Sequence, residues 1–306
     1  MNSRKNQLLA DLALVFVTAV WGATFVSVKE AITRVEPFYF LAIRFGIATL
    51  LMLLITNKRI VQTTRSTLWK GILIGLALFA GYSFQTFGLQ YTTASNAGFI
   101  TGLSVVIVPV TVTFIQKKPP GIISALGIIS ATVGLGLLTI NATLTFNYGD
   151  LLVLFCAFSY ALHILLVGKY SPDHDAFILA TVQIGTVALA SFVAALIKET
   201  APTAEAFNAQ VWRAILITAV FATALAFFVQ TWTQKYTSPT HTAIIFTMEP
   251  VFAAIFAYFI GGESFTLRQG IGAVFILAGM LAAELGGHEK SNERIPEEAA
   301  ENNLKT

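Results

Sequence analysis

Ten long apolar segments constrain the fold of this 306-residue chain more than any other feature. Each holds roughly 20 residues with almost no charge, the length that an α-helix needs to cross a hydrocarbon core of about 30 Å. Charged residues make up only 11% of the chain, against about 25% in soluble domains. The sequence therefore predicts an all-α polytopic membrane protein with ten transmembrane helices in the lipid bilayer. The segments are 12–28, 38–56, 71–90, 94–115, 121–140, 151–167, 176–197, 214–233, 240–260 and 269–285.

The basic residues and the two polar ends of the chain set the predicted orientation. The apolar run after Arg4 and Lys5 has no cleavage site, so we expect a retained first helix and not a signal peptide. With residues 1–10 in the cytoplasm, thirteen lysines and arginines fall on the inner side and five on the outer side, as the positive-inside rule requires. The polar segment 287–306 is expected to be a disordered cytoplasmic tail. The predicted location is the cell (plasma) membrane.

The two halves of the chain resemble each other. "DLALVFVTAVWGATFVSVK" from Asp11 aligns with "DLLVLFCAFSYALHILLVGK" from Asp150, which places Trp21 opposite Tyr160. Farther on, "YTTASNAGFI" aligns with "YTSPTHTAII" at an offset of 145 residues, and this register continues without gaps into the next predicted helix. The sequence thus predicts two repeats of five helices, at 11–140 and 150–286, joined by an external linker at 141–149.

Five helices are an odd number, so the second repeat must enter the membrane upside down relative to the first. Inverted repeats of this kind recur in secondary transporters, where the substrate site lies near the midplane between the repeats. The repeat therefore favours a transporter on physical grounds alone.

Four stretches carry a resemblance to a known family: "WGATF", "PFYFLAIRF", "ASNAGFITGLSVVIVP" and "MEPVFAAIFAYFIGGE". With these the chain resembles the drug/metabolite transporter superfamily, in particular its ten-helix EamA-domain members, from residue 11 to about residue 285. The resemblance implies a secondary carrier without ATP that moves small metabolites, commonly outward. Family cargoes range over amino acids, amines, nucleosides, sugars and drugs. The chain departs from the pattern at "QKKPP", where a "GE" pair often stands, and at Tyr160, where a second tryptophan is common.

Several polar and aromatic residues are predicted to lie at one depth. At about 1.5 Å per residue, Glu249, Trp21 and His163 lie roughly 12–13 Å from the inner face, and Ser104 lies roughly 15 Å from the outer face. Tyr160 and Tyr82 are within a helical turn of this level. These six residues are the predicted substrate or coupling site. For the aromatic residues packing remains the alternative, and for His163 a neutral hydrogen-bonded role does.

Glu249 stands inside an apolar segment and is followed by a proline. A charged glutamate at the bilayer centre costs roughly 3 kcal/mol or more, so such residues face a cavity or a partner. Either Glu249 takes a proton on one side and releases it on the other, or it is locked to Arg44 as a structural ion pair. Pro109 and Pro250 are each expected to interrupt a helix and to free a backbone carbonyl. Arg44, Pro109 and Pro250 are therefore assigned structural or ion-pair roles.

Other classes of function fit the sequence less well. Only one of four histidines lies deep in a helix and Cys156 is the single cysteine, so we expect no metal site, no cofactor and no enzyme. A net charge of +3 gives no reason to expect nucleic acid. The predicted partner is a small-molecule substrate, and the expected state is a monomer or weak homodimer. A multidrug exporter of amphipathic cations and a non-transporting receptor or scaffold remain as alternatives.

Overall fold

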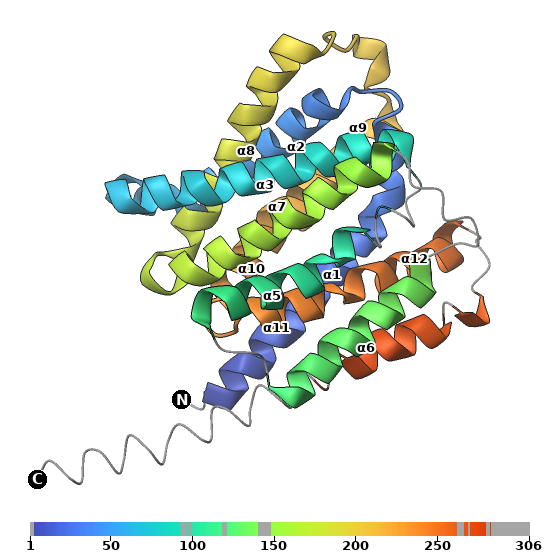
Figure 1. Cartoon of the computed structure of the whole chain (residues 1–306). Coiled ribbons are helices and arrows are strands. Elements are labelled where there is room, and N and C mark those ends of the chain that lie inside the picture. The colour runs from blue at the N-terminus through green and yellow to red at the C-terminus, as the bar shows by residue number, and fades with distance from the viewer. Residues whose placement is uncertain are drawn as a thin grey trace, which may run out of the picture.

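The computed structural model describes residues 3–92, 97, 100–117, 121–139, 148–261, 266–268, 270–279 and 282, and every regular element among them is a helix (Figure 1). The longer helices pack side by side into one bundle. The α-helices are α1 (Ser3–Ala31), α2 (Pro37–Thr56), α3 (Arg65–Tyr91), α5 (Ser104–Gln116), α6 (Ile122–Thr139), α7 (Tyr148–Tyr170), α8 (Ala176–Lys198), α9 (Ala209–Ala219), α10 (Ala226–Thr233), α11 (Pro239–Phe246) and α12 (Met248–Gly261). Three short 3₁₀ turns are η1 (Asn57–Gln62), η2 (Ser171–Asp173) and η3 (Ala204–Ala206), and η4 (Val220–Leu225) is π-helical.

Six helical segments are long and apolar enough to cross a membrane, and they coincide with six of the predicted segments. They are 20 to 27 residues long, which corresponds to about 30–40 Å of helix. Shorter apolar helices occupy Ile100–Ile115, Ile122–Gly134 and Gly270–Gly279. Large apolar side chains such as Leu54, Phe114 and Ile122 point out of the bundle and are at least 77% exposed. An apolar outer surface of this extent indicates contact with lipid.

Capping residues set where several helices begin. Asp175 accepts hydrogen bonds from the first backbone N–H groups of α8, and Asn208 and Ser238 do the same for α9 and α11. Pro37 and Pro239 occupy the first position of α2 and α11. A backbone N–H at this position would have no partner within the helix, so a proline there costs no hydrogen bond. The polar breaks in the sequence therefore define the helix starts.

The segment predicted at 240–260 is a broken helix. α11 ends at Phe246, Thr247 forms a turn, and α12 starts at Met248. Glu249 and Pro250 thus lie in the first turn of α12, where the missing N–H of proline is harmless. The break in this segment therefore lies three residues before Pro250. Pro109 lies inside α5, which itself begins at Ser104 directly after a turn at Leu103.

Glycines allow the central helices of the bundle to approach closely. Methyl groups added at Gly71 and Gly75 of α3 would lie 2.5–2.7 Å from atoms of α8, and one added at Gly81 would lie 2.4 Å from the ring of Tyr160 on α7. α3 therefore packs tightly between α7 and α8, and α2 packs along α8 (Figure 1). The buried rings of Phe45 and Tyr82 belong to the apolar core at this centre.

α6 and the Gly270–Gly279 helix contact each other reciprocally. A methyl group at Gly134 would lie 2.6 Å from the carbonyl oxygen of Gly272, and one at Gly279 would lie 2.6 Å from that of Gly127. Gly272 stands 145 positions after Gly127, and Gly279 stands 145 positions after Gly134. The contact of Gly134 with Gly272 is therefore repeated by Gly279 with Gly127, with the roles of the two halves exchanged.

Candidate functional site

Arg44 of α2 is the charged centre of the candidate site. Its side chain is buried, with 4% of the residue exposed. Nε donates a hydrogen bond to Thr223 Oγ1 over 2.8 Å, and Nη2 donates to Tyr82 Oη over 3.2 Å and to the carbonyl oxygen of Ala222 over 3.3 Å. The guanidinium carbon also lies 4.9 Å from the centre of the Tyr82 ring. Neutral groups of α3 and η4 therefore hold this guanidinium in place.

Trp21 of α1 joins the same acceptor. Its Nε1 donates to the carbonyl oxygen of Ala222 over 2.9 Å, so Trp21 and Arg44 share one backbone oxygen. Its ring contacts Phe246 edge to face at 5.0 Å and Phe227 at 5.7 Å. Ala222 belongs to the π-helical turn η4, and such turns are rare and are frequently found at functional sites. Nothing in the sequence predicts η4, because its residues are ordinary apolar and small ones.

Tyr82 and Tyr160 extend the cluster toward α7. Their rings contact each other edge to face, with centres 5.6 Å apart. Tyr160 Oη donates to Gln85 Oε1 over 3.1 Å, and Gln85 Nε2 donates in turn to Thr101 Oγ1 over 3.4 Å. The predicted residues Trp21, Arg44, Tyr82 and Tyr160 are thus connected through direct contacts or one shared oxygen.

The backbone of Glu249 packs against α1 next to this cluster. A methyl group added at Gly22, the residue after Trp21, would lie 2.8 Å from the carbonyl oxygen of Glu249 and 2.7 Å from the backbone nitrogen of Ala253. The side chain of Glu249 is partly buried. Among the described residues it forms no ion pair and no hydrogen bond. In particular, Glu249 and Arg44 are not within ion-pair distance of each other.

His163 lies beside the cluster but belongs to a separate polar chain. Its Nε2 lies 2.8 Å from Gln183 Oε1 on α8, and Gln183 Nε2 donates to Thr231 Oγ1 over 2.9 Å. The imidazole also contacts the ring of Phe227 edge to face at 5.8 Å. Ser104, at the start of α5, is buried with 7% exposed. The structure thus places His163 against the aromatic cluster and in a buried hydrogen-bonded chain.

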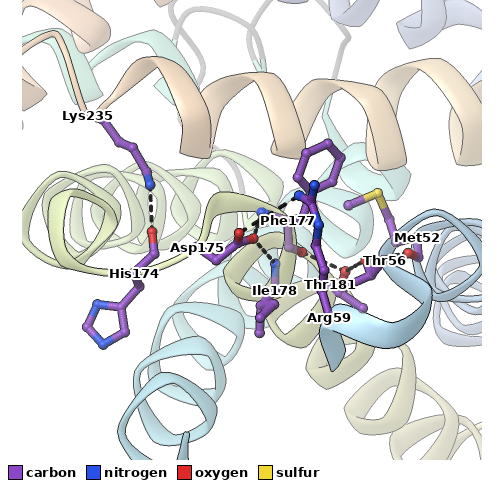
Figure 2. A network of polar contacts seen from close by, with 9 residues as sticks. All are labelled: Met52, Thr56, Arg59, His174, Asp175, Phe177, Ile178, Thr181 and Lys235. Carbon is purple, nitrogen blue, oxygen red and sulfur yellow. Dashed lines mark hydrogen bonds and ion pairs between the residues drawn. The ribbon is translucent and has the colours of Figure 1, made fainter. Parts of the chain in front are cut away.

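A polar network joins three elements at one end of the bundle, here called the η1 end (Figure 2). Thr56 Oγ1 lies 3.1 Å from Thr181 Oγ1, which connects α2 to α8. Lys235 Nζ donates over 2.6 Å to the carbonyl oxygen of His174, which connects the end of α10 to the turn between α7 and α8.

Asp175 is the centre of that network. Its Oδ1 accepts hydrogen bonds from the N–H groups of Phe177 and Ile178 over 2.9 and 3.1 Å, and its Oδ2 lies 4.0 Å from Arg59 Nη1. Arg59 also stands over the ring of Phe177 at 5.4 Å. Since both charged side chains are largely exposed, we expect the capping bonds of Asp175 to matter more than its ion pair.

The opposite end, here called the η3 end, has its own link between α2 and α8. The carboxylate of Glu199 accepts hydrogen bonds from the N–H groups of Phe38 and Tyr39 over 2.7 and 2.9 Å, and so caps α2 from another helix. Burial raises the pKa of the Glu199 carboxyl above its usual value, the nearby Glu36 adds to this, and the two accepted bonds oppose it. A hollow of about 410 Å³ lies at the same end between residues 29–36 and the end of α3.

The comparisons with known proteins agree with this architecture. A family model described as the EamA-like transporter family matches residues 8–140 and again residues 147–283. An uncharacterized transporter of Archaeoglobus fulgidus is 36% identical over 283 residues, covering 92% of this chain and 87% of the relative. The uncharacterized transporter YoaV of Bacillus subtilis is 22% identical, covering 88% and 94%. A solved structure described as "Crystal structure of protein" superposes with a TM-score of 0.75 at 16% identity, covering 90% and 96%, and supports the fold.

These matches identify the class of the protein as an integral membrane transporter. The chain belongs to the EamA-like transporter family, which its two halves match separately. Within the described residues, no three histidine, cysteine, aspartate or glutamate side chains come together as metal ligands.

Proposed function

We propose that the chain is a secondary transporter of two inverted five-helix repeats, which exports a small amphipathic metabolite of the amino-acid class in exchange for protons. The separate family matches of the two halves support the repeat. So does the reciprocal contact of α6 with the Gly270–Gly279 helix. The breaks at Leu103 and Thr247 occur at nearly the same position of each half. All three observations fit a pseudo-twofold axis in the membrane plane.

The η1 end is proposed to face the cytoplasm of a cell whose plasma membrane holds the protein. Arg59 and Lys235 lie at this end, which the charge distribution assigns to the inside. α11 follows α10 at the same end, and the start of α1 lies against α11. Both chain termini would then be cytoplasmic, and the hollow beside residues 29–36 would open to the outside.

One observation carries the proposed cargo site: two residues of opposite charge, Arg44 and Glu249, lie beside Trp21 and Gly22 without pairing with each other. Arg44 reaches Trp21 through the shared oxygen of Ala222, and the backbone of Glu249 packs against the neighbouring Gly22. Unpaired charges are expensive at this depth in a membrane. A cargo that carries both an amino and a carboxylate group would neutralise both charges.

The aromatic side chains around Arg44 complete the proposed site. Trp21, Tyr82 and Tyr160 offer ring faces and edges to the apolar part of a cargo, and ring faces also attract ammonium groups. A zwitterion uses Glu249, Arg44 and the rings together, whereas an amphipathic cation uses only Glu249 and the rings. We therefore propose a zwitterionic cargo and not an amphipathic cation. For Arg44 we favour a role in cargo binding, held by its hydrogen bonds, over a permanent ion pair with Glu249.

Glu249 is the proposed coupling residue. Its carboxyl group has no protein partner among the described residues, and its position at a helix break would allow access to change as the repeats move. Proton binding and cargo release would then alternate at one carboxylate. Proton entry down its gradient would drive cargo outward.

A ligand-stabilisation screen on the purified protein tests the cargo class. We expect zwitterionic amino acids with apolar side chains to raise the melting temperature of the wild type, and their methyl esters or decarboxylated amines to raise it less. The best compound, radiolabelled, is then followed in proteoliposomes. A carrier saturates and exchanges labelled for unlabelled compound, whereas a receptor or scaffold does neither.

Two variants separate the roles of the charges. Glu249→Gln keeps the shape and removes the titration, so it should lose accumulation driven by a pH gradient. Arg44→Lys keeps the charge but loses the forked hydrogen bonds, so it should weaken zwitterions more than amines. If amines stabilise the wild type as well as amino acids do, the cargo is an amphipathic cation. If Glu249→Gln accumulates cargo like the wild type, Glu249 is not the coupling residue.

A further inference from the structure

A second pair of titratable side chains lies apart from the site around Trp21. Asp11 is in the third turn of α1, and His241 is the third residue of α11. His241 Nε2 lies 3.1 Å from Asp11 Oδ1, and the two side chains are 11% and 10% exposed. The pair is at the η1 end, because α11 starts only a few residues after Lys235.

The pair has few partners for two buried polar groups. Nε2 of His241 and both carboxylate oxygens of Asp11 form no hydrogen bond of good geometry among the described residues, although Nε2 and Oδ1 are close. Thr237 Oγ1, one turn before His241, is also buried and also forms no hydrogen bond among the described residues. Leaving a buried polar group unsatisfied costs about 1–3 kcal/mol. As a purely structural pair, Asp11 and His241 would therefore contribute little stability. Acidic residues in membrane helices also tend to mark ion and proton pathways.

The matching position of the other half has different chemistry. Asp150, which aligns with Asp11, accepts a hydrogen bond from the hydroxyl of Thr92. A hydroxyl donor stays neutral across the physiological range. Asp11 faces the imidazole of His241, a side chain that serves as a proton shuttle in many proteins.

The pair is aligned with Glu249 along two neighbouring helices. His241 precedes Glu249 by eight residues on the broken helix α11–α12, and Asp11 precedes Gly22 by eleven residues on α1. At about 1.5 Å per residue these separations are roughly 12 and 16 Å. Because Asp11 contacts His241 and Gly22 contacts Glu249, both helices run from the pair toward Glu249. The pair thus lies between the η1 end and the proposed coupling residue.

We propose that Asp11 and His241 form a proton-binding site at the cytoplasmic mouth, which receives the proton that Glu249 releases. The neutral imidazole takes up one proton and becomes an imidazolium beside the aspartate carboxylate. Loss of the same proton to the cytoplasm restores the neutral imidazole, so the proton count is conserved over the cycle. This site rests on the proposed proton coupling at Glu249.

Other titratable groups on the packed helices have different neighbours. α11 packs against α1, α5, α7 and α12. His163 of α7 faces Gln183, and Lys235, just before α11, donates to the carbonyl oxygen of His174. No ion pair among the described residues joins Asp11 or His241 to a further charge. The remaining charged residues of these helices toward this end are Arg4 and Lys5 on α1, Lys117 at the end of α5, Lys169 on α7 and Glu249 on α12.

The test uses the full-length protein in proteoliposomes with the radiolabelled compound that the stabilisation screen selects. Three variants are compared with the wild type: Asp11→Asn, His241→Gln and the control His174→Gln, which changes a histidine at the same end. Accumulation driven by a pH gradient, its dependence on the pH at the cytoplasmic side, and exchange at equal pH are measured. Exchange reports folding and cargo binding without net proton movement.

We expect Asp11→Asn and His241→Gln to lose driven accumulation by at least about tenfold and to lose its dependence on cytoplasmic pH, while exchange continues. His174→Gln should behave as the wild type. A pH profile that is the same in all four proteins overturns the proposal, as does a parallel loss of exchange, which would mean a structural pair. If the wild type ignores the pH gradient, the coupling at Glu249 fails first and this site fails with it.

Discussion

Gly22→Ala is a one-methyl change at the contact between α1 and α12, and its effect follows from the distances. The added methyl group would lie 2.7 Å from the nitrogen of Ala253, 2.8 Å from the oxygen of Glu249 and 2.9 Å from Cβ of Phe252. Two of these are backbone atoms, which cannot rotate away as a side chain can. To restore an ordinary contact of 3.4 Å, α12 must move about 0.7 Å away from α1. Overpacking of this kind typically costs about 1–3 kcal/mol.

The expected result is a lower melting temperature, by several degrees, for Gly22→Ala in detergent, at roughly 2 °C or more per kcal/mol. The shift also displaces the backbone of Glu249, so the compound from the screen should bind about tenfold more weakly for each 1.4 kcal/mol lost. The matched control is Gly46→Ala on α2, where an added methyl group meets no atom within 4 Å. Because alanine favours helix by about 1 kcal/mol over glycine, this control should be at least as stable as the wild type. Equal melting temperatures and affinities for the two variants would refute the close α1–α12 contact.

Further predictions concern the two ends of the bundle. Burial raises the pKa of Glu199 in the folded protein, so its protonated form stabilises the fold at low pH, and this contribution is lost as the pH rises through the raised pKa. The melting temperature of the wild type relative to Glu199→Gln should therefore fall as the pH rises above about 4.3, the usual glutamate pKa, and a constant difference would contradict this. Asp175→Ala should lower the free energy of unfolding by about 1 kcal/mol through the lost cap of α8, whereas Arg59→Ala should lower it by less than about 0.5 kcal/mol. Equal losses for the two variants would mean that the ion pair contributes more to stability than the cap does. In a variant without native cysteine, cysteines at Arg59 and Lys117 should be labelled from the cytoplasm and those in 141–149 from outside, and labelling of both sets from one side would exclude the inverted repeat.

The positions of the six long apolar helices could be predicted from the sequence because lipid imposes a strict length and polarity on each span. The sequence places Pro250 near a break in this segment, and the structure has the break three residues earlier, at Thr247. The contact of Arg44 with Tyr82 was not predicted, although both residues were selected. Their separate depths could be estimated, but the facing sides of two helices depend on packing that one sequence does not specify.

Two features, one in the candidate site and one apart from it, escaped prediction for different physical reasons. The shared acceptor at Ala222 is a backbone carbonyl in a π-helical turn, so no polar side chain marks it. Asp11 and His241 are visible in the sequence, but each stands near the end of an apolar segment, where polar residues usually meet water. Only the three-dimensional contact turns them into a buried pair.

The hydrogen bond of Trp21 has a consequence for spectroscopy. The chain has four tryptophans, and Trp69, Trp212 and Trp232 are 60%, 42% and 37% exposed on the apolar outer surface. Brominated lipids should quench the emission of these three and spare Trp21, whose indole donates to an oxygen inside the bundle. The remaining fluorescence would then come from one ring that shares its acceptor with Arg44, and its wavelength would follow the electric field there. The protein thus contains an intrinsic optical probe that needs no label.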